Sequence, residues 1–151
     1  MEARARLAPV YTIPGRGAVS EANIKLIQDV YAAFGRGDVP TLLASLTDDV
    51  RWEMVGRPSD FANFGVRNGP AEVGEFFRLV GELEEFDLFE PRAFDAGGDK
   101  VVVQGRAEGR LRATGKPVKT DWLHLFTLRD GKVSGFREFL DTAQYAEAGR
   151  A

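Results

Sequence analysis

The sequence contains no cysteine and only one histidine, His124, among 151 residues. The absence of cysteine excludes disulfides, thiol nucleophiles and cysteine–metal sites, and it fits a reducing compartment, so we expect a cytoplasmic protein. With one imidazole and no thiol, the sequence offers no metal-ligand cluster, no Ser-His-Asp set and no phosphate-binding loop. We therefore expect no metal site.

Charge of one sign and long hydrophobic runs are also scarce. The 20 lysines and arginines nearly balance the 23 acidic residues, and the net charge of −3 includes no basic stripe, so we do not expect nucleic acid as a partner. The longest apolar runs are too short to span a bilayer, and the N-terminal segment lacks the apolar stretch of a signal peptide. The hydrophobic share of 44%, with 11 phenylalanines, is typical of a globular domain.

The first half of the chain has the spacing of amphipathic helices. After Ser20, which suits an N-cap, apolar residues recur at helical spacing, and Gly35 and Gly37 suit the end of the helix. Pro70 suits the first turn of a later helix. The elements predicted in this half are helices over residues 20–34, 39–46 and 70–83, a strand over residues 48–54, and a loop over residues 55–69.

The second half of the chain has the pattern of strands. They are predicted over residues 84–94, 99–114, 119–128 and 132–140. Pro91 indicates an edge or a bulge in the first of them. The second has a small apolar face with Gly105, Ala107 and Gly109, which suits a cavity, although glycines in a strand also mark bends. Helices in the first half of the chain and strands in the second half indicate an α+β fold, with three helices packed on a strongly curved antiparallel or mixed sheet.

The chain shows no internal repeat and no linker, so we expect a single folded unit. The domain is predicted over residues 20–147, with an N-terminal arm over residues 1–19 and a C-terminal tail over residues 148–151. The stretch that follows the last strand, residues 141–151, is predicted to be a short tail.

The last two strands are joined by "RDG", a strong hairpin signal. If Arg129 and Val133 flank a three-residue loop, His124 lies opposite Glu138 on the neighbouring strand, with the Cβ atoms about 5 Å apart. A two-residue loop would slip the register by one and place His124 opposite Arg137 instead. The pairing of the histidine with a carboxylate therefore depends on the turn.

An enclosed pair of His124 and Glu138 suits general acid/base chemistry near neutral pH, because desolvation raises the pKa of a carboxylic acid and a nearby imidazole can share its proton. Aromatic side chains on the same face would select an apolar ligand. The alternative is a solvated cross-strand pair at a sheet edge or in a dimer interface.

Three stretches resemble the nuclear transport factor 2-like superfamily: "IQDVYAAFGRGDVPTLLASLTDDVRWEM", "GPAEVGEFFRLV" and "HLFTLRDGKVSGFREFLDT". Within it they are similar to the SnoaL-like polyketide cyclase and ketosteroid isomerase-related branch, with limonene-epoxide hydrolase as a relative. The resemblance covers residues 20–147, and the order of elements agrees. It implies a cone of curved sheet and helices around an apolar pocket, and a homodimer formed through the outer face of the sheet.

The catalytic residues of these relatives carry over only in part. The base aspartate of the steroid isomerases would fall at Met54, and their helix tyrosine would fall one position before Tyr31. In the epoxide hydrolases, two members of an Asp-Arg-Asp set would fall near Gly105 and Ala107, and the third aligns with Glu138. These departures count against both of those specific activities.

Some cyclases and dehydratases of the superfamily use a pocket histidine with a carboxylate, and the resemblance implies this part for His124 and Glu138. The leading hypothesis is an acid/base enzyme for a hydrophobic cyclic or carbonyl compound, with Glu138 as the base and His124 orienting it or acting as the acid. Isomerisation, aldol-type cyclisation and dehydration all need only placed proton carriers, so no cofactor is expected. The residues expected to contact the ligand are Tyr31, Trp52, Met54, Phe76, Trp122, Phe126 and Phe136.

Two rival hypotheses remain open at the level of sequence. One is a non-catalytic protein that binds a small hydrophobic molecule, which Met54 at the position of the usual base favours. The other is a purely structural dimerisation module, whose pocket would be filled by side chains.

Overall fold

The computed structural model describes residues 17–151, and the first 16 residues of the predicted arm lie outside that range. No helix within residues 17–151 is both long and apolar enough to cross a membrane. The elements in this range are α1 (Ala18–Gly35), α2 (Val39–Ala44), β1 (Leu46–Met54), β2 (Gly65–Asn68), α3 (Gly69–Leu83), β3 (Glu84–Gly97), β4 (Lys100–Leu111), β5 (Pro117–Arg129), β6 (Lys132–Phe139) and α4 (Thr142–Ala148).

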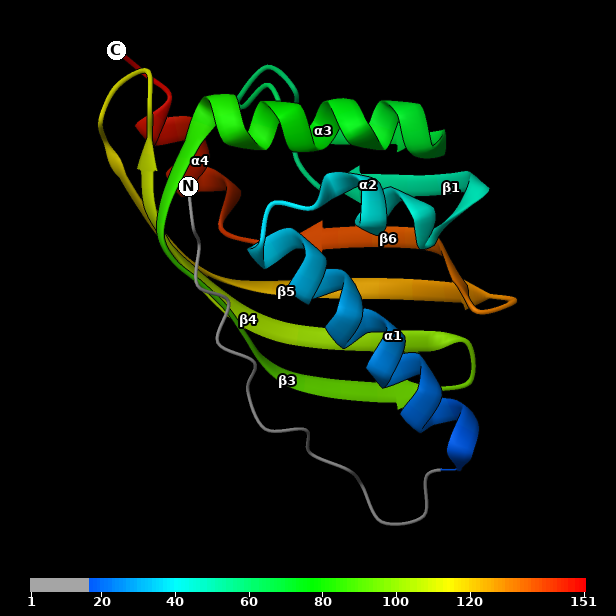
Figure 1. Cartoon of the computed structure of the whole chain (residues 1–151). Helices are drawn as coiled ribbons and strands as arrows, with labels where there is room; N and C mark the ends of the chain where they lie inside the picture. The colour runs from blue at the N-terminus through cyan, green and yellow to red at the C-terminus, as the bar shows by residue number, and fades with distance from the viewer. Residues whose placement is uncertain (1–16) are drawn as a thin grey trace.

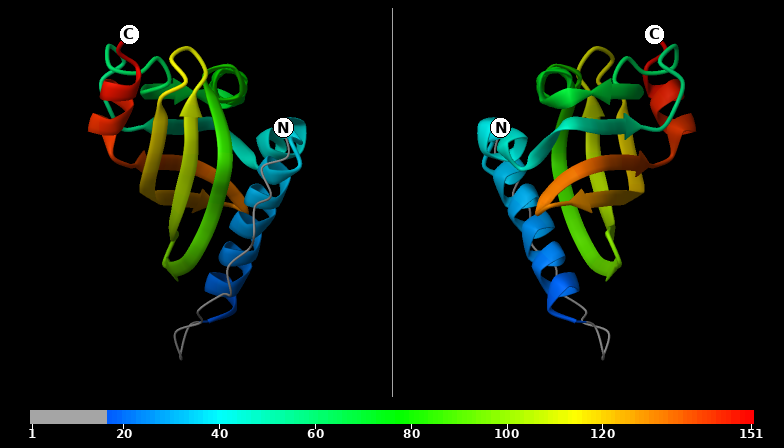
Figure 2. Two further views of the ribbon diagram at one scale, coloured as in Figure 1. Left: turned by 90° about the vertical axis from the view of Figure 1, so that its left-hand side faces the viewer. Right: turned by 90° about the vertical axis from the view of Figure 1, so that its right-hand side faces the viewer.

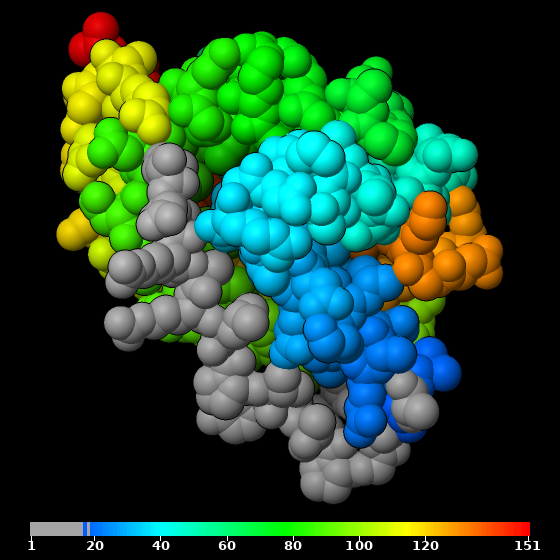
Figure 3. Space-filling model, viewed as in Figure 1, coloured from blue at the N-terminus to red at the C-terminus, as the bar shows by residue number. Residues whose placement is uncertain are grey.

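The strands form one mixed sheet in the order β2-β1-β6-β5-β4-β3. Neighbouring strands are antiparallel except β1 and β6, which are parallel. Helix α1 lies across one face of the sheet and α3 lies along its β1 end (Figure 1), and the long strands curve around that face (Figure 2). Side chains of α1, α2 and α3 cover it (Figure 3). The predicted α+β fold, with three helices on a curved sheet, is confirmed.

The helices of the first half bury the predicted apolar stripes. Helix α1 buries Ile27 and Val30 against the sheet, but it begins at Ala18, two residues before the predicted start. Gly17 is its N-cap, and the Ser20 N–H already donates to the Gly17 carbonyl at 3.1 Å. The predicted capping role of Ser20 is therefore wrong, because a residue inside the first turn cannot also precede it.

The predicted loop before α3 contains a strand that the sequence did not indicate. Residues 65–68 form β2, which pairs antiparallel with residues 51–54 of β1 at the edge of the sheet. Its first residue, Gly65, has a φ of 119°, so the strand begins with a conformation that only glycine adopts readily. Pro91 lies in the other edge strand, β3, next to a bulge between Pro91 and Ala93, as predicted.

The predicted tail contains a fourth helix. Asp141 accepts a hydrogen bond from the Gln144 N–H and caps α4, and Tyr145 and Ala148 are buried. The expectation of a tail over residues 141–151 is wrong because this short helix packs back on β5 and covers the end of the core. Figure 1 shows α4 beside the curved ends of the long strands.

The hairpin between β5 and β6 has the predicted register but not the predicted loop. Arg129 pairs with Lys132, so the turn has two residues, Asp130 and Gly131, both with positive φ as in a type I′ turn. A bulge in the first pairs after the turn then shifts the register by one residue. The bulge compensates for the shorter loop, so the predicted cross-strand pairs form for a reason that the sequence did not reveal.

Candidate active site

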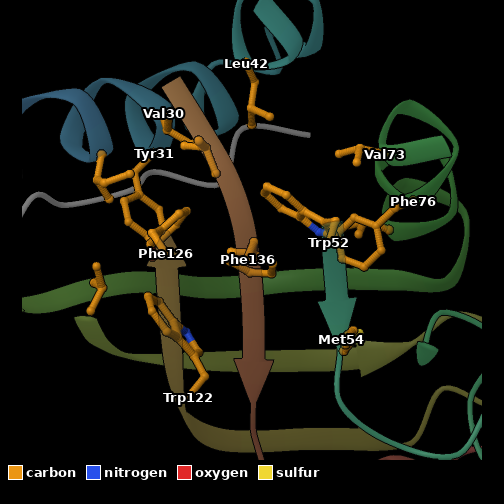
Figure 4. Close-up of a cluster of buried hydrophobic side chains, with 14 of the residues drawn as sticks. Val30, Tyr31, Leu42, Trp52, Met54, Val73, Phe76, Trp122, Phe126 and Phe136 are labelled. Carbon is orange, nitrogen blue, oxygen red and sulfur yellow. The ribbon is translucent and has the colours of Figure 1, made fainter. Parts of the chain in front are cut away.

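The concave face of the sheet presents two rows of side chains from three adjacent strands. They are Trp52–Phe136–Phe126 and Met54–Glu138–His124, from β1, β6 and β5 in that order. Figure 4 shows the labelled members of these rows, with Trp122 of β5, facing Val30, Tyr31 and Leu42 of α1 and α2 and Phe76 of α3. Alternation of side chains along each strand is what brings these residues to one face.

A continuous hydrogen-bonded chain runs from α1 to β6. The Tyr31 hydroxyl lies 2.6 Å from His124 Nδ1, and His124 Nε2 lies 2.5 Å from Glu138 Oε2. The three residues are only 4%, 3% and 7% exposed, and β5 and β6 are interior strands. The alternative of a solvated pair at a sheet edge is therefore wrong.

The protonated Tyr31 hydroxyl fixes the direction of both hydrogen bonds between Tyr31, His124 and Glu138. Burial, and then the negative charge of Glu138, raise the pKa of Tyr31 well above its ordinary value, so its hydroxyl keeps its proton and donates to Nδ1. In the neutral imidazole, Nε2 then carries the hydrogen and donates to the Glu138 carboxylate. Trp122 stacks on the imidazole with 3.9 Å between ring centroids, which holds the ring in place from one side.

All nine residues that the sequence predicted for the site line one cavity of about 60 Å³. This volume is enough for about four to six water molecules. The other lining side chains are mostly apolar, and several come from α1 and α3. The structure thus brings every predicted site residue together.

The same cavity contains a second buried carboxyl group that the sequence analysis missed. Glu84, at the junction of α3 and β3, is 4% exposed, and its Oε1 accepts a hydrogen bond from the Tyr145 hydroxyl at 2.7 Å. Burial, and to a lesser extent the charge of Glu138, raise the pKa of Glu84 to about 8, although the Tyr145 hydrogen bond opposes the rise. Glu84 therefore carries a proton at neutral pH.

Two features of the sequence indicate the positions of Glu84 and its partner Tyr145. Glu84 lies four residues after Val80, so it continues the apolar stripe of α3 into the strand. Asp141, followed by residues of high helix propensity, is a recognisable N-cap that would have placed Tyr145 on a helix. Burial raises the pKa of Tyr145 as well, with the charges of Glu84 and Glu138 adding to the effect.

Two indole N–H groups on the cavity lining have no acceptor. Trp52 Nε1 and Trp122 Nε1 are buried and make no hydrogen bond within the described part of the chain. Trp122 lies flat on β4 because Gly105 leaves room for it, and a Cβ at that position would be 2.1 Å from Trp122 Cζ2. Gly105 thus makes room for Trp122, which forms part of the cavity wall. Gly105 itself does not line the cavity, whereas Ala107 does.

Comparison with known proteins agrees with this architecture. Residues 27–136 match the SnoaL-like domain, and the chain therefore belongs to the SnoaL-like family of the NTF2-like superfamily. An NTF2-like protein from Burkholderia xenovorans LB400 is 33% identical, with a TM-score of 0.81 over 89% of this chain and 100% of that one.

Two other solved structures are similar over nearly their full length. TerC, co-crystallized with polyporic acid, is 30% identical, with a TM-score of 0.75 over 84% of this chain and 97% of that one. A protein from Xanthomonas campestris pv. campestris described as a polyketide cyclase shares the fold at 19% identity, with a TM-score of 0.70 over 85% of this chain and 97% of that one.

Proposed function

We propose that the protein is an acid/base enzyme that needs no cofactor and moves a proton on a small apolar carbonyl compound. The observation that carries this proposal is the buried chain of Tyr31, His124 and Glu138 on the wall of a mostly apolar cavity. The crystallisation of the 30% identical TerC with polyporic acid supports an organic ligand for this chain as well.

Glu138 is the proposed base. His124 Nε2 is hydrogen-bonded to Oε2 of Glu138, and no residue in the range 17–151 donates a hydrogen bond to Oε1 of Glu138. Oε1 takes a proton from the carbon next to the carbonyl, the C–H electron pair forms a C=C bond, and a carbonyl electron pair moves to oxygen. Where the compound also has a C=C bond next to the α-carbon, return of the proton to the far carbon of that bond isomerises the compound without any net oxidation or reduction. His124 and Tyr31 are positioning residues, since His124 is hydrogen-bonded to Oε2 of the carboxylate and Tyr31 is hydrogen-bonded to His124.

The test is proton exchange of cyclohexanone in D2O, followed by NMR. We expect the wild-type protein to accelerate loss of the α-proton signal and Glu138→Gln to reduce that rate by about 100-fold or more. The matched control is Glu53→Gln on β1, whose carboxylate forms ion pairs with Arg51 and Arg137 away from the cavity. A wild-type rate equal to that of buffer, or a Glu138→Gln rate equal to wild type, contradicts the proposal.

A non-catalytic binding protein is the second candidate. Met54 lies directly beside Glu138 in the sheet, where the steroid isomerases that this chain resembles have an aspartate. If cyclohexanone raises the melting temperature but its α-protons do not exchange, the binding function is the correct one.

We also propose a homodimer through the outer face of the sheet. Leu123 and Phe139 pair across β5 and β6 and remain 38% and 37% exposed. Light scattering should give twice the chain mass of 16.6 kDa for the wild type and the chain mass itself for Phe139→Glu. A wild-type protein that is monomeric at tens of micromolar refutes the assignment.

A further inference from the structure

We propose that Glu84, held by Tyr145, donates a hydrogen bond to an oxygen of the ligand, so that the cavity selects apolar compounds that carry a carbonyl group. The inference rests on the proposed function, because it names the substrate class and a second catalytic residue of the same site.

The surroundings of Glu84 favour a neutral carboxyl group. Its single hydrogen-bond partner within the described range is the Tyr145 hydroxyl of α4, which is neutral. The other titratable side chains on the cavity are Tyr31 of α1, His124 of β5 and Glu138 of β6. None of them is a permanent cation, and the charge of Glu138 disfavours a second anion. Arg110 of β4 lines a smaller neighbouring hollow with Glu84, but its guanidinium pairs with Glu85 and Asp87. An unpaired charge at this depth would cost far more than protonation.

A protonated Glu84 has one hydrogen to donate. Because Oε1 accepts from Tyr145, the hydrogen lies on Oε2, which makes no hydrogen bond within residues 17–151. A buried donor without an acceptor is costly in a folded protein, and native structures rarely keep one without a reason. A ligand oxygen on the cavity side would supply the missing acceptor.

The indole groups of Trp52 and Trp122 point to the same ligand chemistry. Both N–H groups are buried on the cavity lining and lack an acceptor. The cavity therefore offers two unsatisfied indole donors, together with one oxygen each of Glu84 and Glu138 that makes no hydrogen bond within residues 17–151. A compound that matches this set has an apolar ring, oxygen acceptors and an acidic C–H. An enolisable ketone has all three features.

Glu84 completes the proton transfer in the following way. As Glu138 Oε1 removes the α-proton, negative charge develops on the carbonyl oxygen, and the Glu84 O–H shares or transfers its proton to that oxygen. The product is an enol, with Glu138 protonated and Glu84 carrying the charge. Collapse of the enol returns the oxygen proton to Glu84, and the carbon regains a proton from Glu138 at the old or a new position.

The test compares [1-¹³C]cyclohexanone with methylenecyclohexane, which has the same shape but no oxygen. For the wild type we expect the ketone to bind more tightly than the hydrocarbon, with the bound carbonyl carbon shifted downfield. We also expect ketone affinity to fall as the pH rises from 7 to 10, while hydrocarbon affinity stays constant. Glu84→Leu should abolish the preference for the ketone and slow α-proton exchange by about 100-fold.

Glu84→Gln keeps a neutral donor and the acceptor for Tyr145, so it should bind the ketone with little dependence on pH. This variant decides the matter if Glu84→Leu fails to fold. Equal pH profiles for the ketone with wild type and Glu84→Gln overturn the inference, even if Glu138→Gln abolishes exchange and so upholds the proposed function. Failure of both probes to bind overturns both proposals.

Discussion

The sharpest prediction concerns how the stability of the wild type and of Glu84→Gln depends on pH. The pKa of Glu84 is raised from 4.5 to about 8 in the folded protein. Below pH 4.5 both the folded and the unfolded chain carry the proton, and its contribution to stability is fully present. Above that value only the folded state keeps the proton, so stability is lost as the pH rises, until Glu84 ionises in the folded state near pH 8.

The magnitude follows from the width of that window. Each pH unit between the two pKa values costs about 1.4 kcal/mol of unfolding free energy, so the loss is about 3 kcal/mol between pH 5 and pH 7 and about 5 kcal/mol over the whole window. Glu84→Gln cannot ionise and lacks this slope. We therefore expect its stability relative to the wild type to increase steadily with pH, whatever constant offset the amide introduces.

Urea unfolding measures the effect directly, because Trp52 and Trp122 are both buried and report unfolding by fluorescence. The matched control is Glu85→Gln, whose carboxylate pairs with Arg110 and Arg112 at the surface. Taking the difference from wild type at each pH removes the titrations that the proteins share. Parallel curves for wild type and Glu84→Gln from pH 5 to pH 8 would show that Glu84 is not protonated in the folded state.

Two further predictions test the walls of the cavity and the hydrogen-bonded chain. Gly105→Ala should lower the free energy of unfolding by about 1–3 kcal/mol and shift the tryptophan emission, since the new Cβ displaces Trp122. The control is Gly81→Ala on a helix, where a Cβ would have nothing within 4 Å, and it should raise the free energy of unfolding by about 0.5–1 kcal/mol. Equal effects of the two substitutions in urea unfolding would refute the packing argument. Tyr31→Phe should cost about 1–3 kcal/mol because His124 Nδ1 loses its partner, and the His124 ring signals in ¹⁵N NMR should change; unchanged signals would mean that the hydrogen bond is absent in solution.

The fold was accessible from the sequence wherever periodicity decided the structure. The apolar stripes of α1 and α3 and the alternation along β4 and β5 are local patterns, and the structure follows them. The pairing of His124 with Glu138 was predicted correctly, but with the wrong turn. A bulge is set by the twist and packing of the whole sheet, and no local signal distinguishes it from a longer loop.

The second carboxyl group was harder to predict because its environment is made by distant parts of the chain. Glu84 follows directly on Leu83, the last residue of α3, and its partner Tyr145 is 61 positions further on. A glutamate in that position suggests solvent until α4 is known to pack over it. The spacing after Val80 and the N-cap at Asp141 indicate the elements on which Glu84 and Tyr145 lie, but the burial of one against the other depends on tertiary packing, which these local signals do not encode.

The contrast between the two carboxyl groups is itself an argument for chemistry at this site. Glu138 is held by an imidazole N–H in the middle of the sheet, whereas Glu84 has only a neutral hydroxyl at the corner between α3 and β3. Burying either group is costly, and apolar side chains of similar size would fill the core at lower cost. A dimerisation module needs neither carboxyl, and a protein that binds a hydrocarbon gains nothing from them. An enzyme that removes a proton from carbon while it protonates oxygen needs both, in opposite protonation states, within one cavity.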